Sequence, residues 1–131
     1  MSVLFSDGFA IIIFVPIYAY VFLLLVDIPI IMANDPYAKR LLWFVFAGSR
    51  GGLNRLKLVS ELREKPLNTN QLAKQLGLDY KAIQHHIVVL EKNNIITRIG
   101  EKYNVTFFIS NFLEANMDSF NEIADKLEKS K

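Results

Sequence analysis

Apolar residues run without interruption through the first part of the chain. From Gly8 to Val26 the sequence contains no charged residue, and Asp7 and Asp27 bound the run. At about 1.5 Å of rise per residue, a helix of this length spans about 30 Å, which is the thickness of a bilayer's hydrocarbon core. The pattern predicts a transmembrane helix within residues 1–33.

Two other interpretations of this run stay open. A secretion signal has basic residues before its apolar core and a cleavage site after it, but residues 1–7 contain no Lys or Arg and no such site follows Val26. A buried helix of a globular domain is usually shorter and has a polar face. Lys39, Arg40 and Arg50 all follow the run. The positive-inside rule therefore predicts a single-pass protein of the cell membrane, with its N-terminus outside and the remainder in the cytoplasm.

A second, shorter apolar segment lies in residues 34–48. Asp35 and Pro36 fit a helix start, with an N-cap followed by proline at the first helical position, and Gly48 fits the end. The apolar stretch 41–47 is too short to cross a bilayer. It either packs on protein, in the same chain or in a second copy, or lies at the membrane surface with Trp43 as an anchor.

The middle of the chain shows three helical periodicities in succession. Apolar stripes predict a first helix that ends before Pro66, a short helix at 71–76 and a longer helix at 79–93. Asn68 and Gln71 fit a capping box at the start of the short helix. We expect the apolar stripes of these helices to face one common core.

A turn and a β-hairpin complete this region. Gly77 supplies the left-handed residue between the second and third helices, which together describe a helix-turn-helix. Two β-rich runs follow at 95–99 and 105–110, joined by the loop 100–104. A helix-turn-helix followed directly by a hairpin is a winged helix. The predicted fold class is mainly α with a small β-hairpin (α+β).

The C-terminal segment, residues 111–131, predicts one amphipathic helix. Asn111 and Glu114 fit a capping box. Apolar positions then recur at spacings of three and four, at Leu113, Met117, Phe120, Ala124 and Leu127. This stripe can pack on the first helix of the domain or meet its counterpart in a homodimer.

Positive charge is concentrated in the middle of the chain. The net charge is +2, but residues 49–110 hold ten Lys or Arg against five Asp or Glu, whereas residues 1–48 and 111–131 are each net negative. A basic domain fits a polyanionic partner. The absence of Cys excludes disulfides and thiolate metal sites. The sequence contains no phosphate-binding loop, hydrolase motif or zinc-enzyme motif, so we expect neither enzymatic activity nor a cofactor.

The string LNTNQLAKQLGLDYKAIQHHIVVLEKNNIITRIGEKYNVTFFIS resembles ArsR-like winged-helix regulators, especially the form common in archaea. The matching features are QLAKQLGL, the HHIVVLE end of the following helix, and the two-stranded wing. The resemblance covers residues 52–110 and implies DNA binding, dimerisation and transcriptional control. Some ArsR-like proteins sense metals through Cys or His clusters. Here His85 and His86 point about 100° apart on a helix, so we expect no metal site unless a second subunit contributes ligands.

Within this fold, the first residues of the second helix of the helix-turn-helix face the major groove. Gln84 can pair with an adenine edge, and Lys81 with guanine or phosphate. The wing is expected to reach phosphates or the minor groove. The predicted DNA-binding residues are Thr69, Asn70, Lys74, Tyr80, Lys81, Gln84, His85, Arg98, Lys102 and Tyr103. The alternative is a merely solvated helix face. His86 lies nearer the apolar stripe, and we expect it to be packed and hydrogen-bonded.

These features together predict a membrane-anchored, sequence-specific, DNA-binding transcriptional regulator. Its parts are a transmembrane helix (1–33), a juxtamembrane helix (34–48), a winged helix-turn-helix domain (49–110) and a dimerisation helix (111–131). The expected partners are double-stranded DNA, membrane lipid and a second copy of the chain, bound through 111–131 with 36–48 as a further contact. The alternative is a winged-helix module for protein interaction or membrane scaffolding without specific DNA binding.

Overall fold

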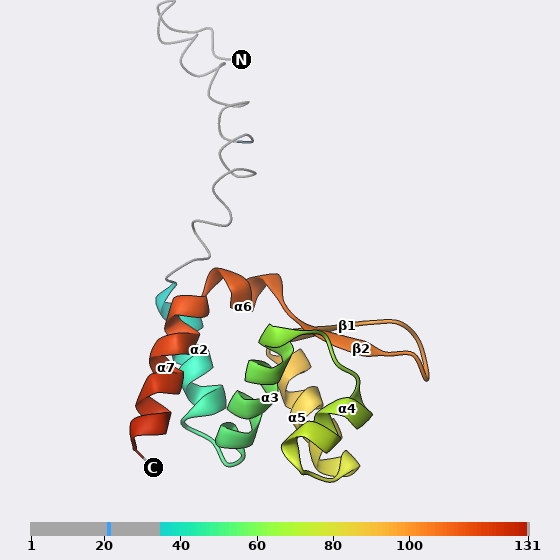
Figure 1. Ribbon diagram of the computed structural model, residues 1–131. Coiled ribbons are helices and arrows are strands. Elements are labelled where there is room, and N and C mark those ends of the chain that lie inside the picture. Colours follow the sequence, from blue (N-terminus) through green and yellow to red (C-terminus); the bar gives the residue numbers. More distant parts are fainter. Residues whose placement is uncertain (1–20, 22–34, 131) are drawn as a thin grey trace, which may run out of the picture. The chain divides into compact units, whose positions relative to one another are not determined.

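The computed structural model describes Val21 and residues 35–130, and the latter belong to a compact unit that runs from Asn34 to Lys131 (Figure 1). The expected transmembrane helix within residues 1–33 lies outside the described residues, apart from Val21. In the part of the chain that is described, no helix is both long enough and apolar enough to cross a membrane.

The first labelled helix, α2 (Pro36–Phe46), begins where the sequence predicts. The carboxylate of Asp35 accepts a hydrogen bond from the backbone N–H of Tyr37 at 3.0 Å, and Pro36 occupies the first turn. One face of the helix, with Leu42 and Val45, is fully buried. This helix is therefore part of the domain core.

Helices α3 (Gly52–Glu64), α4 (Thr69–Leu76) and α5 (Tyr80–Lys92) follow, and α4 and α5 form the helix-turn-helix. The capping box predicted for α4 is confirmed, and α5 is capped as well. Asn68 and Gln71 form the reciprocal capping box of α4, and the Asp79 carboxylate accepts from the N–H of Ala82 at 2.7 Å. Gly77 has a φ of 67°, the left-handed conformation that glycine adopts without steric cost.

The wing consists of β1 (Ile96–Ile99) and β2 (Thr106–Ile109), paired antiparallel with Ile96 opposite Ile109. A further isolated bridge joins Phe107 of β2 to Leu67, in the connection between α3 and α4. The two backbones exchange N–H···O bonds of 2.9 and 3.3 Å there. The hairpin is thus tied to the helical body at its base, and its tip projects away from it (Figure 1).

The C-terminal segment differs from the prediction of one helix. Two helices form, α6 (Asn111–Ala115) and α7 (Met117–Lys129), and Asn116 separates them. The capping residue of α6 is Ser110, whose hydroxyl accepts from the N–H of Leu113 at 3.1 Å and donates to the carbonyl of Asn94 at 2.7 Å. The predicted Asn111–Glu114 box is wrong, because Asn111 already lies inside the helix.

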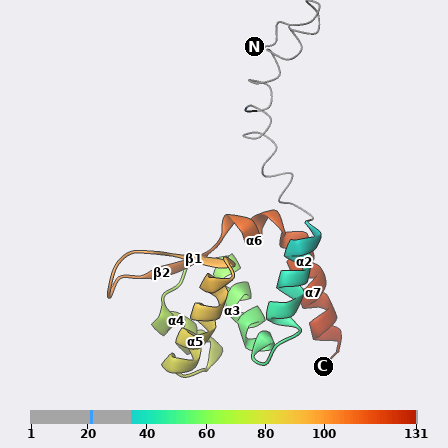
Figure 2. The ribbon, with the colours of Figure 1, turned by 180° about the vertical axis from the view of Figure 1, so that it is seen from behind.

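Helix α7 packs on α2, and the two lie side by side in both views of the ribbon (Figures 1 and 2). The rings of Phe46 and Phe120 meet edge to face, with centroids 5.3 Å apart. Lys39 and Glu122 form an ion pair of 2.8 Å across the same helices. The sequence left open whether this stripe packs within the chain or in a dimer, and the structure shows that Phe120 and Ile123 are buried within the chain.

Candidate nucleic-acid interface

Helix α5 separates cleanly into a buried face and an exposed face. Ile83, Ile87 and Leu90 are at most 3% exposed and pack in the core. The predicted DNA-binding residues of α5 are all exposed, namely Tyr80, Lys81, Gln84 and His85, and Val88 is exposed beside them. The capped N-terminal half of α5 therefore presents a polar and basic surface on a rigid support.

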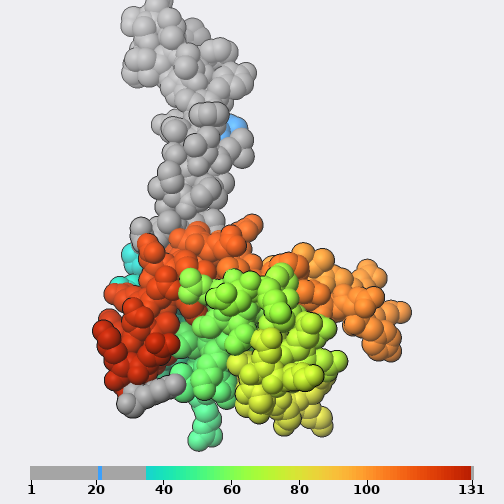
Figure 3. Space-filling view, in the orientation of Figure 1, coloured from blue at the N-terminus to red at the C-terminus, as the bar shows by residue number. Residues whose placement is uncertain are grey.

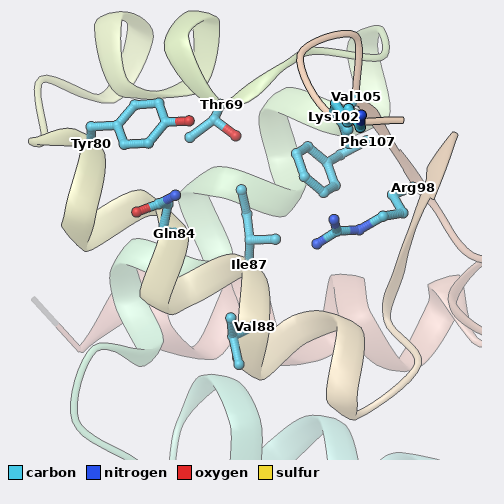
Figure 4. Close-up of a pocket in the computed structure, with 9 residues that line it drawn as sticks. All are labelled: Thr69, Tyr80, Gln84, Ile87, Val88, Arg98, Lys102, Val105 and Phe107. Carbon is cyan, nitrogen blue, oxygen red and sulfur yellow. The ribbon is translucent and has the colours of Figure 1, made fainter. Parts of the chain in front are cut away.

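A groove runs between this face of α5, the start of α4 and the wing (Figure 4). Its main part has a volume of about 190 Å³, and an adjoining part of about 150 Å³ extends towards the wing tip. Both parts are lined by Thr69, Tyr80, Lys102 and Val105. The groove brings together seven of the ten predicted DNA-binding residues: Thr69, Asn70, Tyr80, Gln84, Arg98, Lys102 and Tyr103.

The remaining three predicted residues lie outside the groove. Lys74 on α4 and Lys81 and His85 on α5 are exposed, but none of them lines either part. Within residues 35–130 the ion pairs are Lys39–Glu122 and Arg98–Glu91, and neither pair involves Lys74 or Lys81. These two ammonium groups can therefore act as cations towards an external polyanion.

Arg98 differs from these lysines because its charge is already paired. Its guanidinium donates two hydrogen bonds to the carboxylate of Glu91 near the end of α5, at 2.7 and 2.6 Å. The same group lies over the ring of Phe107, 5.4 Å from its centroid. The hydrogen bond with Glu91 raises the pKa of Arg98. This contact joins the wing to α5, and sequence reasoning missed it because Glu91 and Arg98 belong to different elements.

The tip of the wing depends on unusual backbone conformations. Gly100 has a φ of 109°, and a Cβ atom there would lie 1.8 Å from the carbonyl oxygen of Asn104. Lys102 also has a positive φ, of 54°. The turn leaves the side chain of Tyr103 98% exposed. The space-filling view shows the wing protruding from the surface beside α4 (Figure 3). Lys102 and Tyr103 thus lie at the protruding tip of the wing, away from the helices.

His86 points the other way, into the domain. It is 7% exposed, and its Nδ1 atom lies 3.5 Å from Nη1 of the buried Arg55 on α3. The prediction of a packed, hydrogen-bonded histidine is confirmed. Sequence reasoning missed Arg55, although its spacing to Leu58, Val59 and Leu62 places it on the buried stripe of α3.

The adjacent histidines of α5 do not form a metal site with other described residues. The rings of His85 and His86 are 5.8 Å apart between centroids and tilted by 59°. Among the described residues, no group of three or more His, Asp or Glu side chains is placed to hold a metal ion.

Comparison with known proteins agrees with this geometry. Residues 54–98 match the sequence model of the family described as bacterial regulatory protein, arsR family. This stretch contains most of α3, the helix-turn-helix and the first strand of the wing, and the match supports a DNA-binding transcriptional regulator. None of the curated proteins matches the sequence.

A solved structure shares the fold. Reduced HlyU from Vibrio cholerae superposes with a TM-score of 0.50 at 18% sequence identity, covering 67% of this chain and 84% of that one. A second structure of HlyU from Vibrio cholerae gives a TM-score of 0.48 at 18% identity, covering 70% of this chain and 90% of the other. Within the described unit, α3 to β2 form the winged helix that the sequence predicts for residues 49–110, and α2, α6 and α7 flank it.

Proposed function

We propose that the chain is a sequence-specific, DNA-binding transcriptional regulator. The observation that carries the proposal is the groove that side chains of α4, α5 and the wing line together. The arsR-family match over residues 54–98 supports the same function. In helix-turn-helix proteins the second helix reads base edges in the major groove, and here that helix is α5.

We assign each side chain a role in DNA binding according to its position. Gln84 and Lys81 lie on the exposed face of α5, where an amide and an ammonium can read adenine and guanine edges. Thr69, Asn70 and Lys74 lie on α4 and are assigned to backbone phosphates. Lys102, Tyr103 and His85 add contacts from the wing and from α5. Arg98 is assigned to holding the wing on α5, since Glu91 already occupies its guanidinium.

The proposed assembly is a homodimer formed through α2 and α7. Trp43 and Phe44 on α2 are 43% and 61% exposed, and they border an open apolar depression of about 430 Å³. Lys126 of α7 lies over the Trp43 ring at 5.6 Å. Exposed aromatic side chains flanked by charges are typical of interface centres. The contact would leave the reading face of α5 free, because neither α2 nor α7 contributes a residue to the groove.

Membrane anchoring is the second part of the proposal. The uncharged run Gly8–Val26 supports it, as does the position of Lys39 and Arg40 soon after that run. The expected orientation has the N-terminus outside and the winged helix in the cytoplasm. Protease treatment of sealed vesicles containing a chain tagged at each end tests this. Cleavage of the C-terminal tag from the outside would contradict the proposed orientation.

DNA binding is tested with a fragment of residues 34–131. The fragment has to include α2, because Leu42 and Val45 belong to the core. Titrations against a selected site and a competitor sequence should show tighter binding to the former and a steep loss of affinity with salt. Affinity for DNA no greater than that of any weakly basic domain, with no preference between sequences, would favour a protein-interaction module instead.

Single substitutions then separate the roles. Gln84→Ala and Lys81→Ala should relax the preference between sequences, at a cost of about 1–3 kcal/mol on the preferred site. Lys102→Ala should weaken binding to all sequences evenly and reduce the salt slope by about one. Lys57→Ala is the matched control, because Lys57 is exposed on α3 and lines neither part of the groove.

A further inference from the structure

Arg55 is a buried cation that holds several elements together. It is 3% exposed and lies in the first turn of α3. Its Nε and Nη2 atoms donate to the carbonyl of Val45 at 3.2 and 3.0 Å, and Nη2 also donates to the Ser49 hydroxyl and the Arg50 carbonyl. Its Nη1 atom faces Nδ1 of His86 on α5 at 3.5 Å. One side chain thus connects the end of α2, the following turn and the proposed recognition helix.

The positive charge of Arg55 is balanced by dipoles rather than by an acid. Among the described residues, no carboxylate forms an ion pair or hydrogen bond with its guanidinium. Its acceptors are instead carbonyl oxygens at the C-terminal end of α2 and in the turn, where the helix dipole is negative. Such a pocket tolerates one cation and offers nothing to neutralise a second.

His86 fits this pocket only when it is neutral. Arg55 has no acceptor atoms, so the hydrogen bond requires a lone pair on Nδ1 and places the ring proton on Nε2. The charged or titratable groups that act on His86 are Arg55 from α3 and His85 from α5 itself, and both are basic. Gly51 also lies close to the ring, since a Cβ there would be 3.0 Å from Cε1 of His86. Burial, followed by Arg55 and His85, lowers the pKa of His86.

We propose that Arg55 and His86 are positioning residues for DNA recognition, and that proton uptake by His86 releases the N-terminal half of α5 from α3. This inference rests on the proposed DNA-binding function. A protonated His86 loses its hydrogen bond and faces a guanidinium, so its ring has to leave the pocket. Because the ring is only 7% exposed, we expect its exit to shift α5 relative to α3. DNA that holds α5 in the major groove opposes this movement, so binding favours the neutral ring and affinity falls on acidification.

The pH profile of DNA affinity tests the proposal, using the full chain in detergent. His85 is an exposed histidine on the reading face, so both arms carry His85→Gln and differ only at His86. With His86 intact, affinity should fall about five- to tenfold between about pH 7.5 and about pH 5.5. With His86→Asn added, the profile should be flat within about twofold, because the amide oxygen replaces Nδ1 as acceptor without titrating.

A profile that falls equally in both arms would overturn the proposal. A second readout needs neither DNA nor a substitution. Nuclear magnetic resonance of the unaltered chain should show His86 titrating below the ordinary histidine pKa of about 6.5, with the backbone amides of α5 shifting along the same curve. A His86 that titrates at or above its ordinary range, or α5 amides that do not follow it, would also overturn the proposal. Absence of specific DNA binding at every pH would contradict the proposed function, while this titration would still decide the coupling between His86 and α5.

Discussion

Arg98 is the residue whose role changes most between sequence and structure. In the sequence it is one more cation in the wing, and phosphate contact is its natural role. In the structure its guanidinium is held by two hydrogen bonds to Glu91 and lies over Phe107. A bidentate pair of this kind fixes geometry more than it contributes stability, since exposed ion pairs are worth about 0.2–1 kcal/mol.

We therefore expect Arg98→Ala and Glu91→Gln to weaken DNA binding by the same factor, about two- to fivefold, with an unchanged salt slope. The physical reason is that either change frees the wing from α5 without removing a phosphate contact. Titrations at several salt concentrations measure both quantities. The opposite pattern, tighter binding by Glu91→Gln together with a slope reduced by about one in Arg98→Ala, would show that Arg98 contacts phosphate.

His86 gives a second prediction at this scale, for stability. Burial and the neighbouring cations lower its pKa in the folded state, whereas in the unfolded chain it titrates near its ordinary value of about 6.5. The stabilising contribution is therefore fully present above about pH 6.5 and is lost as the pH falls towards the lowered pKa, because the unfolded state takes up a proton that the folded state excludes.

Urea unfolding of residues 34–131 at about pH 7.5 and about pH 5.5 measures this contribution. The midpoint should drop more on acidification in the unaltered sequence than in His86→Asn, which lacks the titrating ring. Subtracting the drop in midpoint of His86→Asn from that of the unaltered sequence removes the effect of carboxylate protonation, which is common to both proteins. Identical drops in the two proteins would show that His86 titrates alike in the folded and unfolded states.

At the scale of elements, the pairing of α2 with α7 is the feature that periodicity alone left open. The stripe on α7 has coiled-coil spacing, which is compatible with a partner in the same chain or in another. The structure buries Phe120 and Ile123 against α2, and Arg63 of α3 lies over the Phe120 ring at 5.7 Å. The C-terminal helix is therefore part of the monomer core, and only its outer face remains for a second copy.

Phe120→Ala should lower the free energy of unfolding by about 3–5 kcal/mol, because it leaves a cavity between α2 and α7. Leu127→Ala is the matched control and should cost less, since Leu127 lies on the same helix but is only partly buried. Denaturant titration of residues 34–131, at a concentration where the chain is monomeric, measures both. A cost below about 1 kcal/mol for Phe120→Ala would contradict packing of α7 on α2 within the chain.

At the scale of the whole molecule, the described unit has two separate exposed surfaces. The polar and basic surface on α5 and the wing suits DNA, and the aromatic surface with Trp43 and Phe44 on α2 suits a partner protein. In a dimer formed through α2, a two-fold axis would relate the two copies of α5. A two-fold symmetric DNA site would then match a two-fold symmetric protein.

Phe44→Ser should weaken dimerisation at least about tenfold, because it removes an exposed aromatic ring from the proposed contact. It should affect the stability of the monomer little, since the ring is 61% exposed. Tyr103→Ser is the matched control, as it removes an aromatic ring from the wing tip without touching α2. Sedimentation over a range of concentrations measures the association. Equal association in the unaltered chain and in both variants would place the dimer contact elsewhere.

The sequence by itself determined the elements whose signals are local. The caps at Asp35, Asn68 and Asp79, the left-handed Gly77 and the inward stripe of α5 all follow from residues within a few positions of one another. Hydrogen bonds between a capping side chain and the next turn depend on nothing further along the chain. The winged-helix order of elements was predictable for the same reason.

Only the tertiary structure decided the contacts between elements. Arg55 with His86, Arg98 with Glu91, and Phe46 with Phe120 each join residues from different elements. The break at Asn116 belongs with them, because α7 has to turn to lie on α2. Such contacts depend on the distances and angles at which packed elements meet. The sequence pattern shows that a helix has an apolar stripe, but it does not show which other element packs on that stripe.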